Sequence, residues 1–89
     1  MKQAHVYISG FVQGVGFRHF VRNKAVELGL TGWVRNAVDN RVEAVFAGSE
    51  SKIEGVVALC KKGPFLSEVE DVQIEWEEGK EEYGSFEIV

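Results

Sequence analysis

The sequence predicts a single α+β domain in which two helices cover one face of a mostly antiparallel sheet. Three observations support this. Several segments of strand length alternate apolar and polar residues, two segments repeat apolar residues at helical spacing, and turn-forming residues separate most of them. The chain has 89 residues, 45% of them hydrophobic, which is enough for one core and too few for two. We therefore expect residues 1–89 to form one domain.

A strand and a helix open the order of elements, with a loop between them. Residues 4–8 alternate in the manner of a strand, and Gly10 ends it. From Phe17 the apolar residues recur at helical spacing, which predicts a helix over about residues 18–28. Gly29 stands where a left-handed C-terminal cap is expected.

Two strands joined as a hairpin come next. Residues 31–37 and 41–47 are rich in valine and aromatic residues, and Asp39-Asn40 lies between them. Because this dipeptide tolerates the positive φ of a tight turn, we expect the hairpin to turn there.

A second helix follows the hairpin. Ser49 can cap it, while Ser51 and Glu54 offer a competing capping box. Its apolar stripe consists of Ile53, Val56, Val57 and Cys60.

Two further strands complete the chain. Gly63-Pro64 stops the second helix, and residues 72–76 alternate along a fourth strand. After a polar loop over residues 77–84, residues 85–89 form a short final strand.

The resulting order, βαββαβ plus a terminal strand, is the ferredoxin-like arrangement. Each helix has one apolar stripe to bury, so both should lie on the same face of the sheet. The first and second strands then end at one edge, with the third strand between them. We expect the loop over residues 11–17, the helix start at Arg18 and the strand end near Asn36 to share this edge, about 10 Å apart.

The loop before the first helix has the composition of an anion site. Gly10, Gly14 and Gly16 let its backbone curl and direct several N–H groups at one point. The N-terminus of the helix adds the positive end of a dipole, and Arg18 adds a planar guanidinium that matches two phosphate oxygens. A cation at a helix N-terminus opposes the dipole, so we expect an anion to compensate it.

Nucleotide-binding motifs do not fit this loop. No Gly-Lys-Ser/Thr follows it, and His19 stands where a dinucleotide fingerprint needs glycine. We expect His19 itself to be a solvated surface residue, since adjacent helical residues point in different directions.

Two segments of the chain resemble the paired signatures of acylphosphatases. The first reads Val-Gln-Gly-Val-Gly-Phe-Arg over residues 12–18, and the second reads Gly-Trp-Val-Arg-Asn over residues 32–36. Gly63-Pro64 before the fourth strand also matches, and the resemblance extends over essentially the whole chain. Asn40 departs from the glycine common in the family, which concerns the hairpin and not the chemistry.

The resemblance implies a metal-free, cofactor-free hydrolase that cleaves small acyl phosphates into a carboxylate and inorganic phosphate. It assigns Arg18 and Asn36 as catalytic residues, with Asn36 positioning the attacking water. The backbone amides expected to hold the phosphoryl group are those of Gln13, Gly14, Val15, Gly16, Phe17 and Arg18. The matched residues include no obvious general base, so we expect the substrate phosphate to take the proton of the water.

Other functions remain alternatives. A ferredoxin-like domain can be a non-enzymatic ligand-binding or RNA-binding module, which would use aromatic residues on its sheet. The net charge of −4 argues against nucleic acid and anionic membranes, and no apolar stretch is long enough to span a membrane. A carbamoyl-phosphate-binding domain, of the kind fused at the start of larger maturation enzymes, is a third possibility.

The single cysteine bears on location. Cys60 falls on an apolar helical stripe, where we expect a buried thiol and not a nucleophile. Because it has no partner for an intramolecular disulfide, we expect a reducing, cytoplasmic compartment. We also expect the protein to be a monomer.

Overall fold

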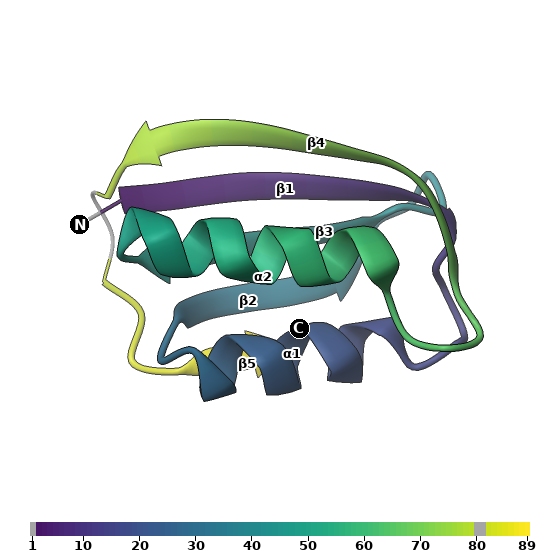
Figure 1. Cartoon of the computed structure of the whole chain (residues 1–89), viewed down its shortest axis with the longest axis horizontal. Helices are drawn as coiled ribbons and strands as arrows, with labels where there is room; N and C mark the ends of the chain where they lie inside the picture. The colour runs from purple at the N-terminus through teal and green to yellow at the C-terminus, as the bar shows by residue number, and fades with distance from the viewer. Residues whose placement is uncertain (1, 80–81) are drawn as a thin grey trace.

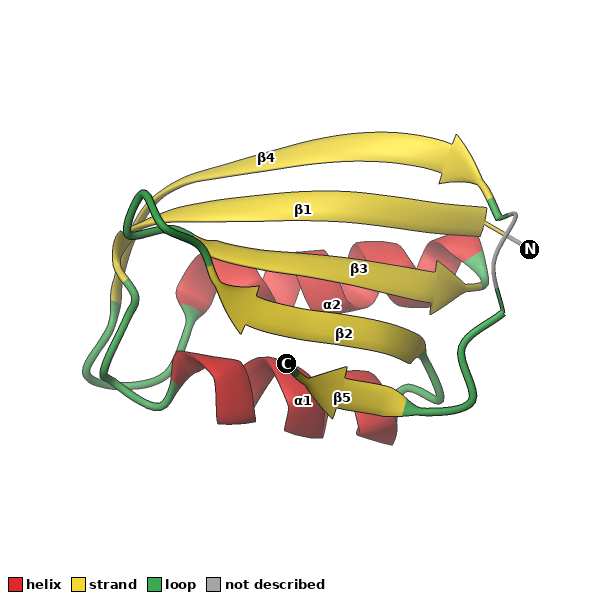
Figure 2. Cartoon of the chain, turned by 180° about the vertical axis from the view of Figure 1, so that it is seen from behind, coloured by secondary structure: helices red, strands yellow, loops and turns green. Residues whose placement is uncertain are grey.

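The computed structural model describes residues 2–79 and 82–89, and within them it has the expected order of elements (Figure 1). In chain order these are β1 (Lys2–Phe11), α1 (Phe17–Glu27), β2 (Thr31–Asn36), β3 (Val42–Gly48), α2 (Glu50–Lys62), β4 (Glu68–Glu78) and β5 (Phe86–Ile88). Both helices lie on one face of the sheet, and Figure 2 shows the opposite face free of helices. The ferredoxin-like prediction is confirmed.

The sheet has the strand order β4-β1-β3-β2-β5. The central strand β3 pairs antiparallel with both β1 and β2, and β4 pairs antiparallel with β1. Among the strands of the described residues, only the short β5 is parallel to its neighbour, β2. Because β1 and β2 flank β3 and both run against it, they end at the same edge of the sheet.

Strands β1 and β4 are longer than the hydrophobic pattern predicts. β1 and β4 remain paired well beyond residues 4–8 and 72–76, as far as Lys2 opposite Glu78. The ammonium of Lys2 donates to the carboxylate of Glu78 at 3.0 Å, on exposed side chains. Apolar and polar residues alternate only in the half-buried part of such a strand. Its polar ends therefore resemble a loop in the sequence.

The β2–β3 hairpin turns through three residues, 38–40, and not through a two-residue turn. The amide of Ala37 donates to the carbonyl of Arg41 at 2.7 Å, which closes the loop. Asn40 has the positive φ that the sequence predicts, at 70°. A turn followed by a residue in the left-handed region is the usual three-residue hairpin loop, which Asn40 ends in place of glycine.

The core lies between the helices and the inner face of the sheet. Val6 and Ile8 on β1, together with Val21 on α1, are completely buried. Phe86 on β5 stacks on Phe46 of β3, with ring centroids 5.5 Å apart, and so ties the last strand to the core. None of the helices in the described ranges is long and apolar enough to cross a membrane.

The two expectations for Cys60 and His19 hold. Cys60 is a free, fully buried thiol on α2, and burial raises its pKa to about 12, which keeps it protonated and unreactive. His19 is exposed on α1.

Candidate active site

The sheet register places Asn36, the last residue of β2, level with Ile8, where the pairing of β1 with β3 ends; β1 then continues along β4 to Phe11. Ile8 on β1 and Asn36 on β2 both pair with Val42 of β3, from opposite sides. Two strand spacings separate the backbones at this level, which amounts to about 10 Å. The prediction that Asn36 shares an edge with the loop after β1 is therefore confirmed.

The segment between β1 and α1, residues 12–16, is called the glycine loop below. Gly14 and Gly16 have φ values of 78° and 79°, which residues with a side chain rarely adopt. A Cβ added to either glycine would meet no atom within 4 Å. The backbone conformation therefore favours glycine at both positions, while the space above them is open.

The prediction that Gly10 ends the first strand and belongs to the loop is wrong, because Gly10 lies within β1 and pairs with Val69 of β4. A Cβ on Gly10 would collide with the carbonyl oxygen of Glu68, and one on Gly32 would collide with that of Val45. These two positions permit close strand pairing, so they are structural.

The N–H groups of the glycine loop are not used in hydrogen bonds to other described residues. Within residues 2–79 and 82–89, no backbone amide of residues 13–18 donates a hydrogen bond to a backbone carbonyl or to a side chain. The first N–H groups of an α-helix lack intrahelical partners in any case, so Phe17 and Arg18 add to this set. The result is a group of donors available to an anion.

The N-terminus of α1 departs from the usual helix electrostatics. Its N-cap, Gly16, makes no side-chain capping bond, and no acidic residue lies in the first turn. Arg18 occupies that turn and forms no ion pair with any described residue. The helix dipole and the guanidinium therefore add up to an uncompensated positive site.

Helix α2 provides the contrast. It begins with Glu50 in its first turn and ends with Lys61 and Lys62, so its charges match the dipole. Ser49 occupies its N-cap position as expected, although the hydroxyl makes no capping hydrogen bond. The missing compensation is thus specific to α1, at the end where an anion is expected.

Asn36 ends β2 on the helix side of the sheet. Successive side chains of a strand alternate between faces, and Val34 is buried toward the helices while Arg35 is exposed on the opposite face. Asn36 therefore projects on the same side as the N-terminus of α1. Its side chain is exposed to solvent.

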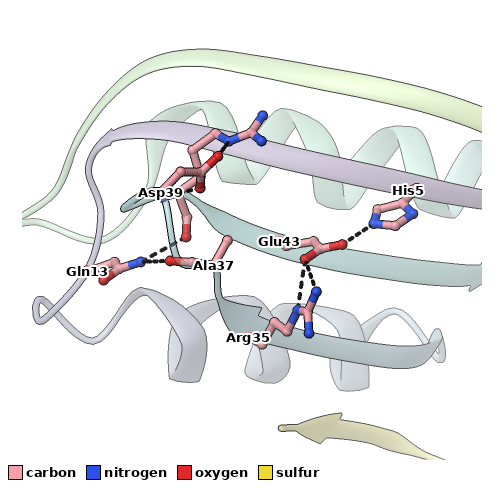
Figure 3. A network of polar contacts seen from close by, with 7 residues as sticks. His5, Gln13, Arg35, Ala37, Asp39 and Glu43 are labelled. Carbon is pink, nitrogen blue, oxygen red and sulfur yellow. Dashed lines mark hydrogen bonds and ion pairs between the residues drawn. The ribbon is translucent and has the colours of Figure 1, made fainter.

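The side chain of Gln13 joins the glycine loop to the hairpin that carries Asn36. Its Nε2 donates to the carbonyl oxygens of Ala37 and Arg41, each at 2.9 Å (Figure 3). Sequence reasoning assigned only the backbone amide of Gln13 and missed this contact. Its only signal was a polar side chain within the loop motif, which does not name the partner.

The face of the sheet opposite the helices, called the open face, holds a buried carboxylate that the sequence analysis also missed. Glu43 on β3 is 6% exposed and accepts hydrogen bonds from His5 Nε2 at 2.5 Å and Arg35 Nε at 2.8 Å (Figure 3). Burial by itself would raise the pKa of Glu43, but these hydrogen bonds and the charge of Arg35 outweigh it and hold the pKa below its usual value. This network lies across the sheet from the glycine loop, so we assign it to stability.

The lowered pKa of Glu43 gives a pH prediction. Its stabilising effect should be complete above the unfolded-state pKa of 4.5 and should disappear as the pH falls through the lower folded-state pKa. Glu43→Gln should reduce the free energy of unfolding by about 1–3 kcal/mol at pH 7, and this deficit should shrink below pH 4.5. Urea unfolding of both proteins at pH 7 and at a pH below 4.5 measures this deficit.

Glu78→Gln is the matched control for Glu43. Its carboxylate also pairs with a cation, Lys2, but its side chain is 75% exposed. Solvent screens such a pair, so the change should be smaller than for Glu43. Equal effects of the two substitutions at pH 7 would show that the buried network contributes nothing particular.

Comparison with known proteins identifies the relatives of this chain. The family model for acylphosphatase matches residues 4–88. The chain is 49% identical to an acylphosphatase of Roseiflexus over 89 residues, covering 100% of this chain and 96% of the relative. Its structure is similar to that of the acylphosphatase from Bacillus subtilis, with a TM-score of 0.97 and 38% identity, covering 100% of this chain and 99% of that one.

A similar domain occurs within a larger protein. Full-length HypF, in a phosphate- and nucleotide-bound form, matches with a TM-score of 0.88 and 38% identity. The match covers 100% of this chain but 12% of HypF. The fold of this chain thus occurs both in a relative of similar length and within a larger protein.

Proposed function

This chain belongs to the acylphosphatase family and hydrolyses acyl phosphates to a carboxylate and inorganic phosphate, and we propose that it does so where the glycine loop, the first turn of α1 and Asn36 meet. The observation that carries this assignment is the uncompensated positive site at the α1 N-terminus, at the same edge of the sheet as Asn36. We further propose that residues 1–89 act as one domain.

The phosphoryl group binds to the free N–H groups and to the Arg18 guanidinium. The backbone donors are those of Gln13, Gly14, Val15, Gly16, Phe17 and Arg18. A tetrahedral dianion needs several donors directed at one point, which the left-handed glycines of the loop allow. The same donors neutralise the equatorial oxygens as charge redistributes in the transition state.

Asn36 orients the attacking water through its side-chain amide. The water oxygen bonds to phosphorus, the bond from phosphorus to the acyl oxygen breaks, and the carboxylate leaves with that electron pair. The proton of the water passes to a phosphoryl oxygen, which yields inorganic phosphate. Because a carboxylate is a good leaving group, positioning and charge neutralisation supply the catalysis that the reaction needs.

The site requires no metal ion. Its groups are N–H donors and a guanidinium, whereas a divalent cation in a phosphoryl-transfer site is held by carboxylates or other oxygen ligands. A cation would be repelled by Arg18 and the α1 dipole. Arg18 and the loop amides take the place that the ion has elsewhere.

An assay with benzoyl phosphate tests this function. Purified protein treated with excess EDTA should release phosphate at the same rate as untreated protein. The reason is that the proposed site binds the substrate with N–H donors and a guanidinium and not through a metal ion. Added Mg²⁺ should not raise the rate. Activity that disappears in EDTA and returns with a divalent ion would contradict the metal-free site, and no activity in any condition would contradict the function.

Binding of RNA on the open face is the less favoured function. Tyr7 and Trp33 lie there, but the guanidinium of Arg41 covers the Tyr7 ring at 4.5 Å and that of Arg35 lies 5.4 Å from the Trp33 ring centre. Stacking bases would have to displace both arginines. Their charges are also paired with Asp39 and Glu43. We therefore propose that this face does not bind nucleic acid.

Location and oligomeric state are also part of the proposal. The free thiol of Cys60 supports a reducing, cytoplasmic compartment. The edge strand β4 carries many acidic residues, among them Glu75, Glu77 and Glu78, and like charges oppose pairing with the same edge of a second copy. We propose a monomer.

A further inference from the structure

We propose that the side chain of Gln13 is a positioning residue that fixes Asn36 relative to the bound phosphoryl group. This inference rests on the proposed function and deepens it. The backbone of Gln13 belongs to the phosphoryl-binding loop, while its side chain reaches the hairpin after β2. One residue therefore links the group that holds the phosphorus to the group that holds the water.

The contacts use the whole donor capacity of the Gln13 amide. Nε2 has two N–H groups, and it donates to two carbonyl oxygens, those of Ala37 and Arg41. Both distances are 2.9 Å and both bonds are partly buried. Ala37 directly follows Asn36 in the chain, so the bond holds the residue next to the proposed water-orienting amide.

The position of Asn36 explains why it needs such support. The ladder between β2 and β3 ends at the pair of Asn36 and Val42. Beyond it, the hairpin is closed by the single bond from the Ala37 amide to the Arg41 carbonyl, and Val38 at its tip is fully exposed. A strand end with so few bonds frays easily. Gln13 binds both sides of this last closed pair.

The remaining contacts of the hairpin point away from the glycine loop. Arg41 pairs with Asp39 at 2.6 Å, and its guanidinium lies over Tyr7 on the open face. These contacts order the tip but do not reach residues 12–16. Among the described residues, Gln13 forms the only side-chain hydrogen bonds between the glycine loop and the hairpin.

Loss of the link should therefore affect turnover more than phosphate binding. The backbone amide of residue 13 remains in any variant, so the phosphoryl site keeps its donors. The water, however, loses its fixed position, and a misplacement of about 1 Å can cost about 10²-fold in rate. We expect Gln13→Met to lower kcat about 10- to 100-fold, while the inhibition constant of inorganic phosphate changes less than about threefold.

The test uses two variants and one control. Gln13→Met keeps the length of the side chain without its donors, and Gln13→Asn keeps the amide on a shorter stem that cannot reach both carbonyls. Asn40→Gly alters the same hairpin but leaves the two acceptor carbonyls, and glycine accepts the φ of 70° at that position. We expect both Gln13 variants to lose turnover and Asn40→Gly to retain it.

A second readout does not depend on activity. The amide of Ala37 closes the hairpin, so its hydrogen exchange, followed by NMR, reports how well the strand end is held. We expect faster exchange at Ala37 in both Gln13 variants and unchanged exchange at Val21 in the core. A kcat equal to that of the wild-type protein in both Gln13 variants would overturn the proposal. Equal losses of turnover and of phosphate binding would also overturn it. Unchanged exchange at Ala37 would overturn it even if the chain proved inactive with every acyl phosphate.

Discussion

Arg18→Ala is expected to lower kcat/KM for benzoyl phosphate by about 10³-fold or more, because an arginine that stabilises a phosphoryl-transfer transition state contributes about 10³- to 10⁵-fold. The guanidinium also binds the ground-state phosphate, so inhibition by inorganic phosphate should weaken together with the loss of turnover. Steady-state kinetics with phosphate as the competing inhibitor measures both effects. The fold should persist, since Arg18 forms no ion pair within the described residues.

Arg22→Ala is the matched control for this prediction. Arg22 lies one turn further along α1, is exposed and carries the same charge, but it lines a hollow beside β5 and lies outside the glycine loop. The two substitutions change the net charge equally, so an effect of charge alone would appear in both. Comparable losses of kcat/KM in the two variants would remove Arg18 from the phosphoryl site.

The sequence predicts the elements of this fold because each carries its own periodic signal. The buried alternation of β1 and the apolar stripe of α2 both match the observed burial. The edge shared by the glycine loop and Asn36 then follows from strand order alone. Strand ends were harder to predict, since β4 continues through exposed glutamates that pair with β1 and leave no hydrophobic trace.

The contacts between distant side chains could not be predicted in the same way. Gln13 binds residues 24 and 28 positions away, and its acceptors are backbone carbonyls, which every residue has. The sequence names the donor but not the partner. The partners of Glu43 could not be predicted either. Glu43 is the only acid in an apolar strand, and its burial is explained once the strand register places His5 and Arg35 beside it on the same face.

Asn36→Ala should mainly lower turnover. The side-chain amide is assigned to the water and not to the phosphate, so kcat should fall about 10²- to 10³-fold, the usual cost of one well-placed donor. KM and the inhibition constant of phosphate should each change less than about threefold. This pattern differs from that of Arg18→Ala, in which binding and turnover fall together, and the same steady-state assay separates the two roles.

Asn23→Ala controls for the loss of an exposed amide. Asn23 lies on α1 and faces solvent, away from the glycine loop, so its removal should leave kcat unchanged.

A double variant that combines Asn36→Ala with Gln13→Met adds a second constraint. If Gln13 acts only by placing Asn36, the double variant should be no slower than Asn36→Ala alone, because the link has nothing left to position. A further loss of turnover in the double variant would mean that Gln13 acts on the phosphoryl group itself.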